Sequence, residues 1–262
     1  MKAVRADKKL GQHWLNDSES LGFIVNHANL RTQDKVLEIG PGTGELTARL
    51  IKTVNHITAL ELDERLIEGL EVRFVKDKDR LDIIKGDIRT FDLTKLHKDY
   101  KLVANIPYYL SAYILRILFE TNNRPSVAVL LVQKEVAERV GAKSGQASLL
   151  SVMTQIYYEV RMGEIIYPDK FTPPPKVDSQ ILILTRRPQP LLNIDKKRFL
   201  RILKAGFSER RKKLRSSLSG GLRLDKYVVE ELCKKAGVDP NLRAQNLGLN
   251  DWYSLYLELE ND

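Results

Sequence analysis

The segment from Lys35 to Asp63 constrains the fold more than any other part of the sequence. Lys35 to Ile39 is a β-rich run, and Gly40 to Gly44 follows it as a loop that contains three glycines. Apolar residues then recur at helical spacing, and Ile57 to Leu60 has the pattern of a second strand. This order of strand, glycine loop, helix and strand predicts a Rossmann-like α/β fold, in which the glycines let a bound nucleoside approach the backbone.

Two acidic residues indicate which nucleoside the loop accepts. Glu61 ends the second strand, 21 positions after Gly40, where Rossmann-like folds grip ribose hydroxyls. Glu38 lies two positions before Gly40 and would repel a phosphate, although it could instead face solvent or cap a loop. The loop also lacks the full dinucleotide spacing and the Lys-Ser/Thr ending of a P-loop. S-adenosylmethionine, which carries a sulfonium and an ammonium but no phosphate, fits this pattern, with Gly40 and Gly42 among its contacts.

Two further predicted strands end in polar residues. Leu81 to Ile84 precedes Asp87, whose carboxylate would accept a hydrogen bond from the adenine amino group of the cofactor. Asp87 could equally be an Asx-turn residue. Leu102 to Ala104 precedes Asn105, and the carboxyl ends of such strands form one ligand-binding edge. We therefore expect the cofactor and a target base to meet at this edge.

The segment Asn105 to Tyr109 has the residue types that a target adenine needs. Asn105 supplies an amide acceptor, while Pro107 and the extended Ile106 can direct carbonyl oxygens outward. Tyr108 offers a flat face on which a ring with an exocyclic amine can stack. The structural alternative is a loop that ends a strand, with its tyrosines packed against a helix.

A proline-rich segment, 168–178, separates the two strands predicted at Arg161 to Tyr167 and Ser179 to Thr185. Its three consecutive prolines impose an extended conformation. Such a rigid loop could hold Phe171 over the mouth of the site as a second stacking face. Alternatively, Phe171 fills the core.

Beyond Arg186 to Pro190, which has the composition of a linker, the sequence predicts a small helical domain. We expect a methyltransferase-like domain over residues 1–187 and a helical RNA-binding domain over residues 188–262. The expected helices are Arg198 to Lys204, Ser208 to Leu218, Lys226 to Ala236 and Trp252 to Leu259.

A net charge of +9 favours a polyanionic partner, with nucleic acid ahead of an anionic membrane surface. Residues 195–215 hold ten Lys or Arg residues against two acids, a density typical of phosphate contacts rather than of a merely solvated helix face. The RNA-binding residues predicted from this cluster are Lys197, Arg198, Arg201, Arg210, Arg211, Lys212, Lys213 and Arg215.

The single cysteine, Cys233, excludes an intramolecular disulfide and a multi-cysteine zinc site. The chain has no apolar run long enough for a membrane span and no signal peptide pattern. We therefore expect a cytoplasmic protein without a metal site, and a monomer by default.

These segments together resemble the KsgA-type small-subunit ribosomal RNA adenine N6,N6-dimethyltransferases over nearly the whole chain. The matching segments are 9–15, 38–44, 61–63, 86–87, 105–109, 133–136, 171–179 and 207–218. The resemblance implies dimethylation of two adjacent adenines in a hairpin near the end of the small-subunit RNA. It implies contacts of S-adenosylmethionine with His13, Leu15, Gly40, Glu61, Asp87 and Asn105. It also implies that Asn105, Ile106, Pro107 and Tyr108 contact the target base, with Phe171 as the opposing ring.

The chain departs from the family pattern at a few positions. His13 replaces a common asparagine, Trp14 replaces a common phenylalanine, and Ser111 to Tyr113 replaces a Ser/Thr-Thr-Pro pattern. The last change bears on how the following helix begins, not on the reaction.

The expected reaction is in-line attack of the adenine N6 on the sulfonium methyl, favoured by acceptors for the amine and by positioning. No strong general base is expected, because the alkylated amine is acidic enough to lose its proton afterwards. Two alternatives stay open: a large-subunit RNA methyltransferase of the macrolide-resistance type, and a ribosome assembly factor without catalysis. The segment 207–218 and the Gly11 to Gln12 arm favour the small-subunit type.

Overall fold

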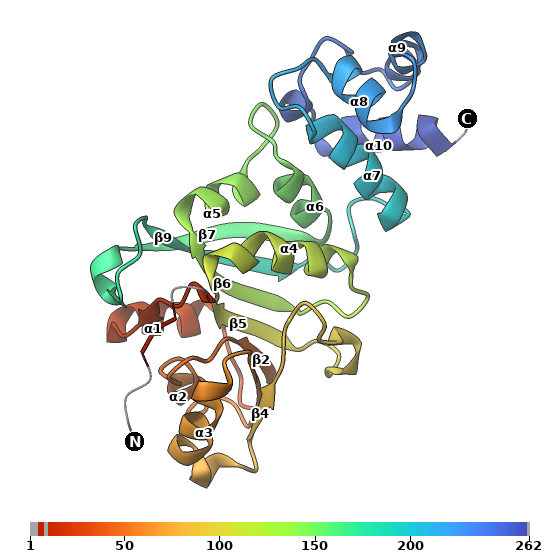
Figure 1. Ribbon diagram of the computed structural model, residues 1–262. Coiled ribbons are helices and arrows are strands. Elements are labelled where there is room, and N and C mark those ends of the chain that lie inside the picture. Colours follow the sequence, from red (N-terminus) through yellow and green to blue (C-terminus); the bar gives the residue numbers. More distant parts are fainter. Residues whose placement is uncertain (1–4, 8–9, 261–262) are drawn as a thin grey trace. The chain divides into compact units, whose positions relative to one another are not determined.

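The computed structural model describes residues 5–7 and 10–260, so the basic residues Lys2, Lys8 and Lys9 of the N-terminal arm lie outside the described part. The chain divides into two compact units (Figure 1). The first comprises Met1–Ala137 and Glu159–Arg186, and the second comprises Glu138–Tyr158 and Arg187–Asp262. Residues 138–158 thus belong to the same unit as the C-terminal helices.

The first unit is built on a seven-stranded mixed sheet in the order β4-β3-β2-β5-β6-β9-β7. Its strands are β2 (Lys35–Ile39), β3 (His56–Glu61), β4 (Leu81–Lys85), β5 (Lys101–Asn105), β6 (Val127–Gln133), β7 (Tyr158–Ile166) and β9 (Ser179–Arg186). Strands β2 to β6 run parallel, and β9 is antiparallel to β6. This topology confirms the predicted Rossmann-like class and its strands.

Burial of the strands follows their place in the sheet. In the central β6, Ala128 to Val132 are all buried, as expected of a strand covered on both faces. At the outer end of the sheet, β4 buries only Leu81 and exposes Asp82. One core cluster joins alternate strand residues such as Val103, Val129 and Leu131 to helices of the first unit.

Four helices accompany the sheet in the first unit: α1 (Ser18–His27), α2 (Thr47–Leu50), α3 (Glu64–Arg73) and α4 (Ser111–Glu120). Their starts obey local chemistry. Asp17 caps α1 by accepting from the Ser20 N–H at 2.9 Å, and Asp63 caps α3 by accepting from the Arg65 N–H at 3.1 Å. Because Asp63 lies two residues after the end of β3, the cap fixes the chain where it leaves the ligand-binding edge.

A small second sheet connects the N-terminal arm to the proline-rich segment. Strand β1 (Trp14–Leu15) pairs antiparallel with β8 (Phe171–Thr172), in the register Trp14 to Thr172 and Leu15 to Phe171. The Asn16 N–H also donates to the Lys170 carbonyl at 3.2 Å. The arm is therefore an integral strand of the fold from Trp14 onward.

The second unit is helical. It contains the second half of α5 (Lys134–Gly141) together with α6 (Leu149–Tyr157), α7 (Lys196–Phe207), α8 (Leu214–Leu222), α9 (Lys226–Lys235) and α10 (Leu249–Glu260). Phe199, Leu203 and Trp252 are fully buried within it. Among the described residues, no helix combines the length and the apolar character that crossing a membrane requires.

The predicted helix from Ser208 to Leu218 is wrong at its start. Helix α7 ends at Phe207 and α8 begins only at Leu214, so 208–213 form a connection of turns. A continuous helix would bring the like charges of 210–213 within one turn of each other, which is unfavourable. A continuous helix would also move Leu214, the first residue of α8, out of its fully buried position.

Candidate functional site

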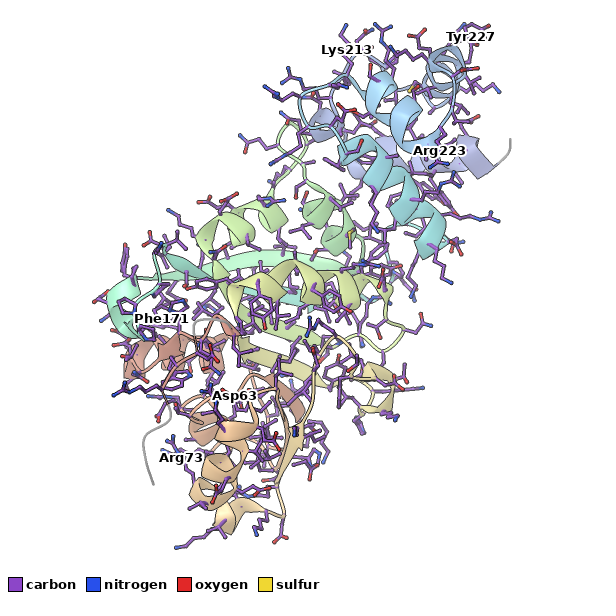
Figure 2. The ribbon with its side chains drawn as sticks, viewed as in Figure 1. Asp63, Arg73, Phe171, Lys213, Arg223 and Tyr227 are labelled. Carbon is purple, nitrogen blue, oxygen red and sulfur yellow. The ribbon has the colours of Figure 1, made fainter. Side chains whose placement is uncertain are left out.

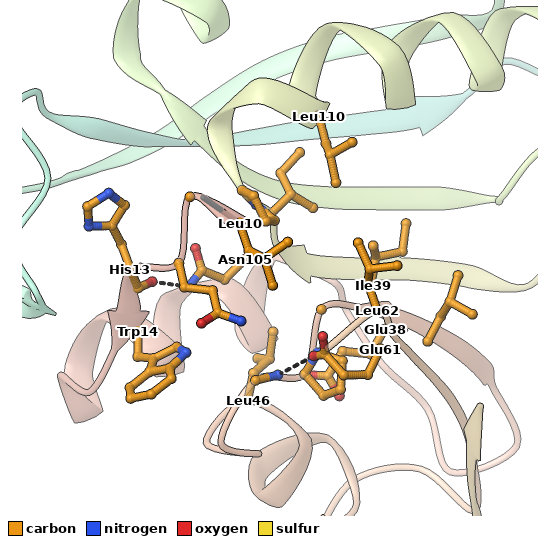
Figure 3. Close-up of a pocket in the computed structure, with 18 of the residues that line it drawn as sticks. Leu10, His13, Trp14, Glu38, Ile39, Leu46, Glu61, Leu62, Asn105 and Leu110 are labelled. Carbon is orange, nitrogen blue, oxygen red and sulfur yellow. Dashed lines mark hydrogen bonds between the residues drawn. The ribbon is translucent and has the colours of Figure 1, made fainter. Parts of the chain in front are cut away.

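A cleft lies at the carboxyl ends of β2 to β5, with an empty volume of about 990 Å³ that is partly open to solvent (Figure 3). Segments far apart in sequence line it: the arm 10–15, the glycine loop 40–43, and residues that follow β3, β4 and β5. The predicted residues that the structure brings together here are His13, Leu15, Gly40, Gly42, Glu61, Asp87, Asn105, Ile106, Pro107 and Tyr108. The fold thus gathers the polar strand ends at one edge, as expected.

The glycine loop forms one wall with its backbone. Gly40 and Gly42 have φ angles of 68° and 60°, in the left-handed region that side chains disfavour. A Cβ atom on Gly42 would lie 3.3 Å from the indole of Trp14. The Gly40 N–H donates to the Leu60 carbonyl at 2.9 Å, which ties the loop to β3. The wall is therefore open to a ligand because it has no side chains at these positions.

Glu61 is the acid at the end of β3, and it is buried. Its carboxylate accepts from the Gly42 N–H at 3.0 Å and from the Asp63 N–H at 2.8 Å. Burial raises the pKa of Glu61, while these backbone hydrogen bonds oppose that rise. Because a carboxylate has about four acceptor positions, the two oxygens can still accept from two ribose hydroxyls.

Glu38 is 1% exposed, so the alternative that it faces solvent is wrong. Its Oε2 accepts from the Thr47 hydroxyl at 2.7 Å, and its Oε1 has no hydrogen-bond partner among the described residues. Burial, followed by the repulsion of Glu61, raises the pKa of Glu38 to about 8. A buried carboxyl group with an unused oxygen suits a cationic ligand, which would favour its charged form.

Asp87 forms an Asx turn and also lines the cleft, so it combines the two roles predicted for it. Its Oδ1 accepts from the Arg89 backbone N–H at 2.9 Å, as in an Asx turn, and its Oδ2 accepts from the Arg89 guanidinium at 2.5 Å. These hydrogen bonds, led by that of the Arg89 side chain, lower the pKa of Asp87. The residue also lines the cleft, so its ionised carboxylate is available there as an acceptor.

Asn105 ends β5 with its side chain oriented by the N-terminal arm. Its Nδ2 donates to the backbone carbonyl of His13 at 3.3 Å, a contact visible in Figure 3. This bond assigns the donor side of the amide to the arm and leaves Oδ1 on the other side. No described residue donates to Oδ1, which is therefore an acceptor free to meet a ligand.

Tyr108 is held on both its ring and its hydroxyl. The ring stacks on His13, with centroids 5.8 Å apart and an interplanar angle of 21°. The hydroxyl shares a hydrogen bond of 2.6 Å with Ser179, at the start of β9. His13 in turn bonds through Nδ1 to the Pro173 carbonyl at 2.7 Å. Around this tyrosine, the segment 105–109 thus meets the N-terminal arm and the proline-rich segment.

Phe171, labelled in Figure 2, does not occupy its expected position over the mouth of the site. Its side chain is 4% exposed and packs in the core cluster with Leu15 and Ile181. The cause is a long-range strand pairing: pairing with Leu15 in the β1 and β8 ribbon turns the ring inward, so that it buries its large apolar surface. In this arrangement neither face of the ring is open to a base.

The residues predicted to bind RNA lie in the second unit and differ in exposure. Lys197, Arg198, Arg201 and 210–213 are exposed, whereas Arg215 is half-buried. Arg215 contacts Glu230 at 2.5 Å, so its charge is largely neutralised within the unit. The exposed cations are the ones that can reach phosphates.

Three residues that line the cleft, in the N-terminal arm and in the segment 105–109, have no role predicted from the sequence. Gln12 donates to Asp63 at 2.8 Å and holds the arm beside β3, and Tyr109 lines the cleft while 53% exposed. The indole Nε1 of Trp14 is buried without a partner among the described residues. The only sequence signal for Trp14 is its place between His13 and Leu15.

The hydrogen-bond acceptors of the cleft fit S-adenosylmethionine. A free buried carboxyl oxygen on Glu38 suits the ammonium, Glu61 suits the ribose, and Asp87 suits the adenine amino group. Together with the mixed Rossmann-like sheet, this site defines the class of S-adenosylmethionine-dependent methyltransferases.

Within that class, the chain belongs to the ribosomal RNA adenine dimethylase family, whose sequence profile matches residues 3–261. It is 38% identical over 259 residues to the ribosomal RNA small subunit methyltransferase A of Dehalococcoides mccartyi, covering 97% of this chain and 89% of that protein. It is 39% identical over 257 residues to the protein of the same name from Syntrophotalea carbinolica, covering 96% of both chains.

Two solved structures resemble both units. A dimethyladenosine transferase from Plasmodium falciparum matches with a TM-score of 0.81 and 26% identity, over 95% of this chain and 98% of that one. The 23S rRNA methyltransferase ErmE matches with a TM-score of 0.71 and 28% identity, over 94% of this chain and 99% of that one. The chain is therefore an S-adenosylmethionine-dependent ribosomal RNA adenine dimethyltransferase.

Proposed function

We propose that this protein methylates N6 of two adjacent adenines in the 3'-terminal hairpin of small-subunit ribosomal RNA, during biogenesis of that subunit. The observation that carries the proposal is the Oδ1 of Asn105, which accepts from no described residue, on a side chain that lines the cleft together with Tyr108. The choice of the small subunit is supported by the names of the curated relatives.

The chain's own groups supply acceptors for the adenine amine. Asn105 Oδ1 accepts one N–H bond and the backbone carbonyl of Ile106 accepts the other, which favours a more pyramidal and more nucleophilic nitrogen. Ile106 is preferred over Pro107 because the Pro107 carbonyl already accepts from the Leu110 N–H at 2.9 Å. Bound S-adenosylmethionine supplies the electrophilic methyl group on its sulfonium. The proton leaves the alkylated amine afterwards, so no side chain has to act as a strong base.

The target adenine must leave its stack before it can reach Asn105, at a cost of a few kcal/mol. Tyr108 offsets part of this cost by stacking, because the bonds to its hydroxyl and the contact with His13 hold its ring in one orientation. A pre-oriented ring loses little entropy when the base arrives.

The exposed cations of the second unit bind the RNA backbone in this proposal. The phosphates are contacted by Lys197, Arg198, Arg201 and 210–213. These contacts position the subunit but do not distinguish one RNA sequence from another. The protein acts as a monomer on the immature small subunit. Cytoplasmic action agrees with a single cysteine that is buried as a free thiol.

The test is methyl transfer from radiolabelled S-adenosylmethionine to undermethylated small subunits, with large subunits and naked RNA as parallel substrates. We expect label in small subunits only. The similarity to ErmE keeps the large-subunit reaction as the second candidate, and label in large-subunit RNA would establish it. Binding of the cofactor without transfer to any substrate would instead favour an assembly factor.

A further inference from the structure

The cofactor cleft has an imbalance of charge. Its described lining includes four acidic side chains, those of Glu38, Glu45, Glu61 and Asp87, and no lysine or arginine. S-adenosylmethionine carries an ammonium and a sulfonium, which suit such a cleft, but it also carries one carboxylate. That carboxylate has no cationic side chain to pair with in the lining, so neutral N–H donors must bind it.

Trp14 has a neutral side-chain donor in the lining that is not used within the described part of the protein. Its Nε1 is buried and has no hydrogen-bond partner, which is unfavourable for an N–H group. The indole lies against the glycine loop, where a Cβ on Gly42 would be 3.5 Å from Nε1. Figure 3 shows the indole nitrogen on the side of the ring that faces this loop.

The position of Trp14 along the cleft indicates which end of the cofactor it meets. Asp87 and Glu61 mark the adenine and ribose ends, whereas the His13 carbonyl and Asn105 mark the end where the methyl is transferred. Trp14 follows His13 in the chain and begins β1, and its indole lies against the glycine loop, between the His13 carbonyl bound by Asn105 and Gly42. The amino acid tail of the cofactor, with its carboxylate, is attached at this end.

We infer that Trp14 is a cofactor-binding residue whose Nε1–H donates a hydrogen bond to the carboxylate of the S-adenosylmethionine tail. The nitrogen is covered by its neighbours in this structure, so the indole must turn slightly, or the glycine loop must yield, for the bond to form. The bond satisfies the unused donor and holds the tail without adding a positive charge beside the sulfonium.

The direct test uses the indole N–H signals in a ¹H–¹⁵N spectrum of the intact protein. The chain has two tryptophans, so Trp14→Phe assigns the Trp14 signal by its loss, and Trp252 serves as internal reference. Addition of S-adenosylhomocysteine should move the Trp14 proton downfield, as a new hydrogen bond to a carboxylate requires. 5'-Methylthioadenosine, which has the nucleoside but no amino acid tail, should leave it nearly unmoved.

Calorimetry of Trp14→Phe gives the second readout, because phenylalanine keeps an aromatic ring but has no N–H donor, and 5'-methylthioadenosine controls for the smaller ring. We expect the affinity for S-adenosylhomocysteine to fall about tenfold, as for one hydrogen bond to a charged group. The affinity for 5'-methylthioadenosine should stay within about twofold of that of the unmodified protein. An equal response to the two ligands, in either experiment, would overturn the assignment, as would an unmoved Trp14 signal. If the variant does not fold, the two indole signals of the unmodified protein still decide, because the assignment fails if neither signal responds differently to the two ligands.

Discussion

Asn105 illustrates how one hydrogen bond gives a residue its chemical role. Because its Nδ2 donates to the His13 carbonyl, the amide cannot rotate freely, and Oδ1 is the atom presented to a ligand. The residue type alone predicts both a donor and an acceptor. Which of them faces the target depends on the N-terminal arm, which is distant in sequence and therefore not visible from the local pattern.

The first prediction concerns Asn105→Ala. Loss of a pre-oriented group that acts on the transition state costs about 10²–10³ in rate, so turnover should fall by at least about 100-fold. Binding of S-adenosylhomocysteine should change much less, because Glu61, Asp87 and the glycine loop are untouched. Single-turnover methyl transfer and calorimetry measure the two effects. Full turnover with unchanged binding would refute the assignment of Asn105.

The second prediction concerns Glu38, whose pKa is raised to about 8, mainly by burial. A cationic ligand favours the carboxylate form, so S-adenosylmethionine affinity should rise with pH from 6 to 8, by up to about tenfold per pH unit. Calorimetry in buffers of different ionisation enthalpy should show proton release on binding. Glu38→Gln should abolish this release, and an unchanged release in that variant would contradict the role of Glu38.

The raised pKa of Glu38 also affects the free energy of unfolding. This effect decreases as pH rises, whereas the effect on cofactor affinity increases. Between the ordinary pKa of 4.5 and about 8, the native state keeps a proton on Glu38 that the unfolded chain has lost. The contribution of Glu38 to the free energy of unfolding therefore falls as pH rises through this window. Chemical denaturation at several pH values, compared with Glu38→Gln, isolates this contribution.

At the scale of elements, the ribbon of β1 and β8 determines where Phe171 lies. The prolines after Phe171 do predict an extended segment, but extended backbone can present a side chain on either of two faces. The choice is made by pairing with Leu15, across more than 150 residues of sequence. Long-range strand pairing of this kind is what local patterns do not contain.

The third prediction follows from that burial. Phe171→Ala should lower the free energy of unfolding by about 3–5 kcal/mol and Phe171→Leu by about 1–2 kcal/mol. Turnover per folded Phe171→Leu molecule should stay near normal if Phe171 only packs the core. Stacking on a base is worth about 1–3 kcal/mol, so a well-folded Phe171→Leu protein that lost tenfold or more in turnover would restore the stacking role.

Helix periodicity is informative for other elements, since α9 and α10 occur where the apolar spacing predicts helices over Lys226 to Ala236 and Trp252 to Leu259. The connection 208–213 was missed because the apolar pattern resumes at Leu214 without an obvious breaker. Only the mutual repulsion of 210–213 indicates that the helix is interrupted.

At the scale of the whole molecule, the charge of +9 is concentrated where it can act on a polyanion, in the exposed cations of the second unit. Motif order, composition and the family resemblance are enough to predict the Rossmann-like unit, the helical unit and ten of the residues that line the cleft, but not Trp14 or Tyr109. No pattern in the sequence predicts that residues 138–158 belong to the second unit, because packing between helices decides this. The functional division at residues 187 and 188 stays a prediction.

The fourth prediction uses the difference between exposed and paired cations. Arg210→Gln combined with Arg211→Gln should weaken RNA binding. The slope of log affinity against log salt concentration should become shallower by about one to two. Arg215→Gln is the matched control, because Arg215 is half-buried and paired with Glu230, and it should leave that steepness nearly unchanged. Equal slopes for the double variant and the unmodified protein would remove 210–211 from the RNA contact.

The central claim, dimethylation of two adjacent adenines in small-subunit RNA, is tested most directly by mapping the product. Undermethylated small subunits are incubated with the protein and S-adenosylmethionine, the RNA is read by primer extension, and its nucleosides are identified by mass spectrometry. The account predicts extension stops at two adjacent adenines in the 3'-terminal hairpin, with N6,N6-dimethyladenosine as the product. Stops elsewhere, or a methylated nucleoside other than an N6-methylated adenosine, would contradict it.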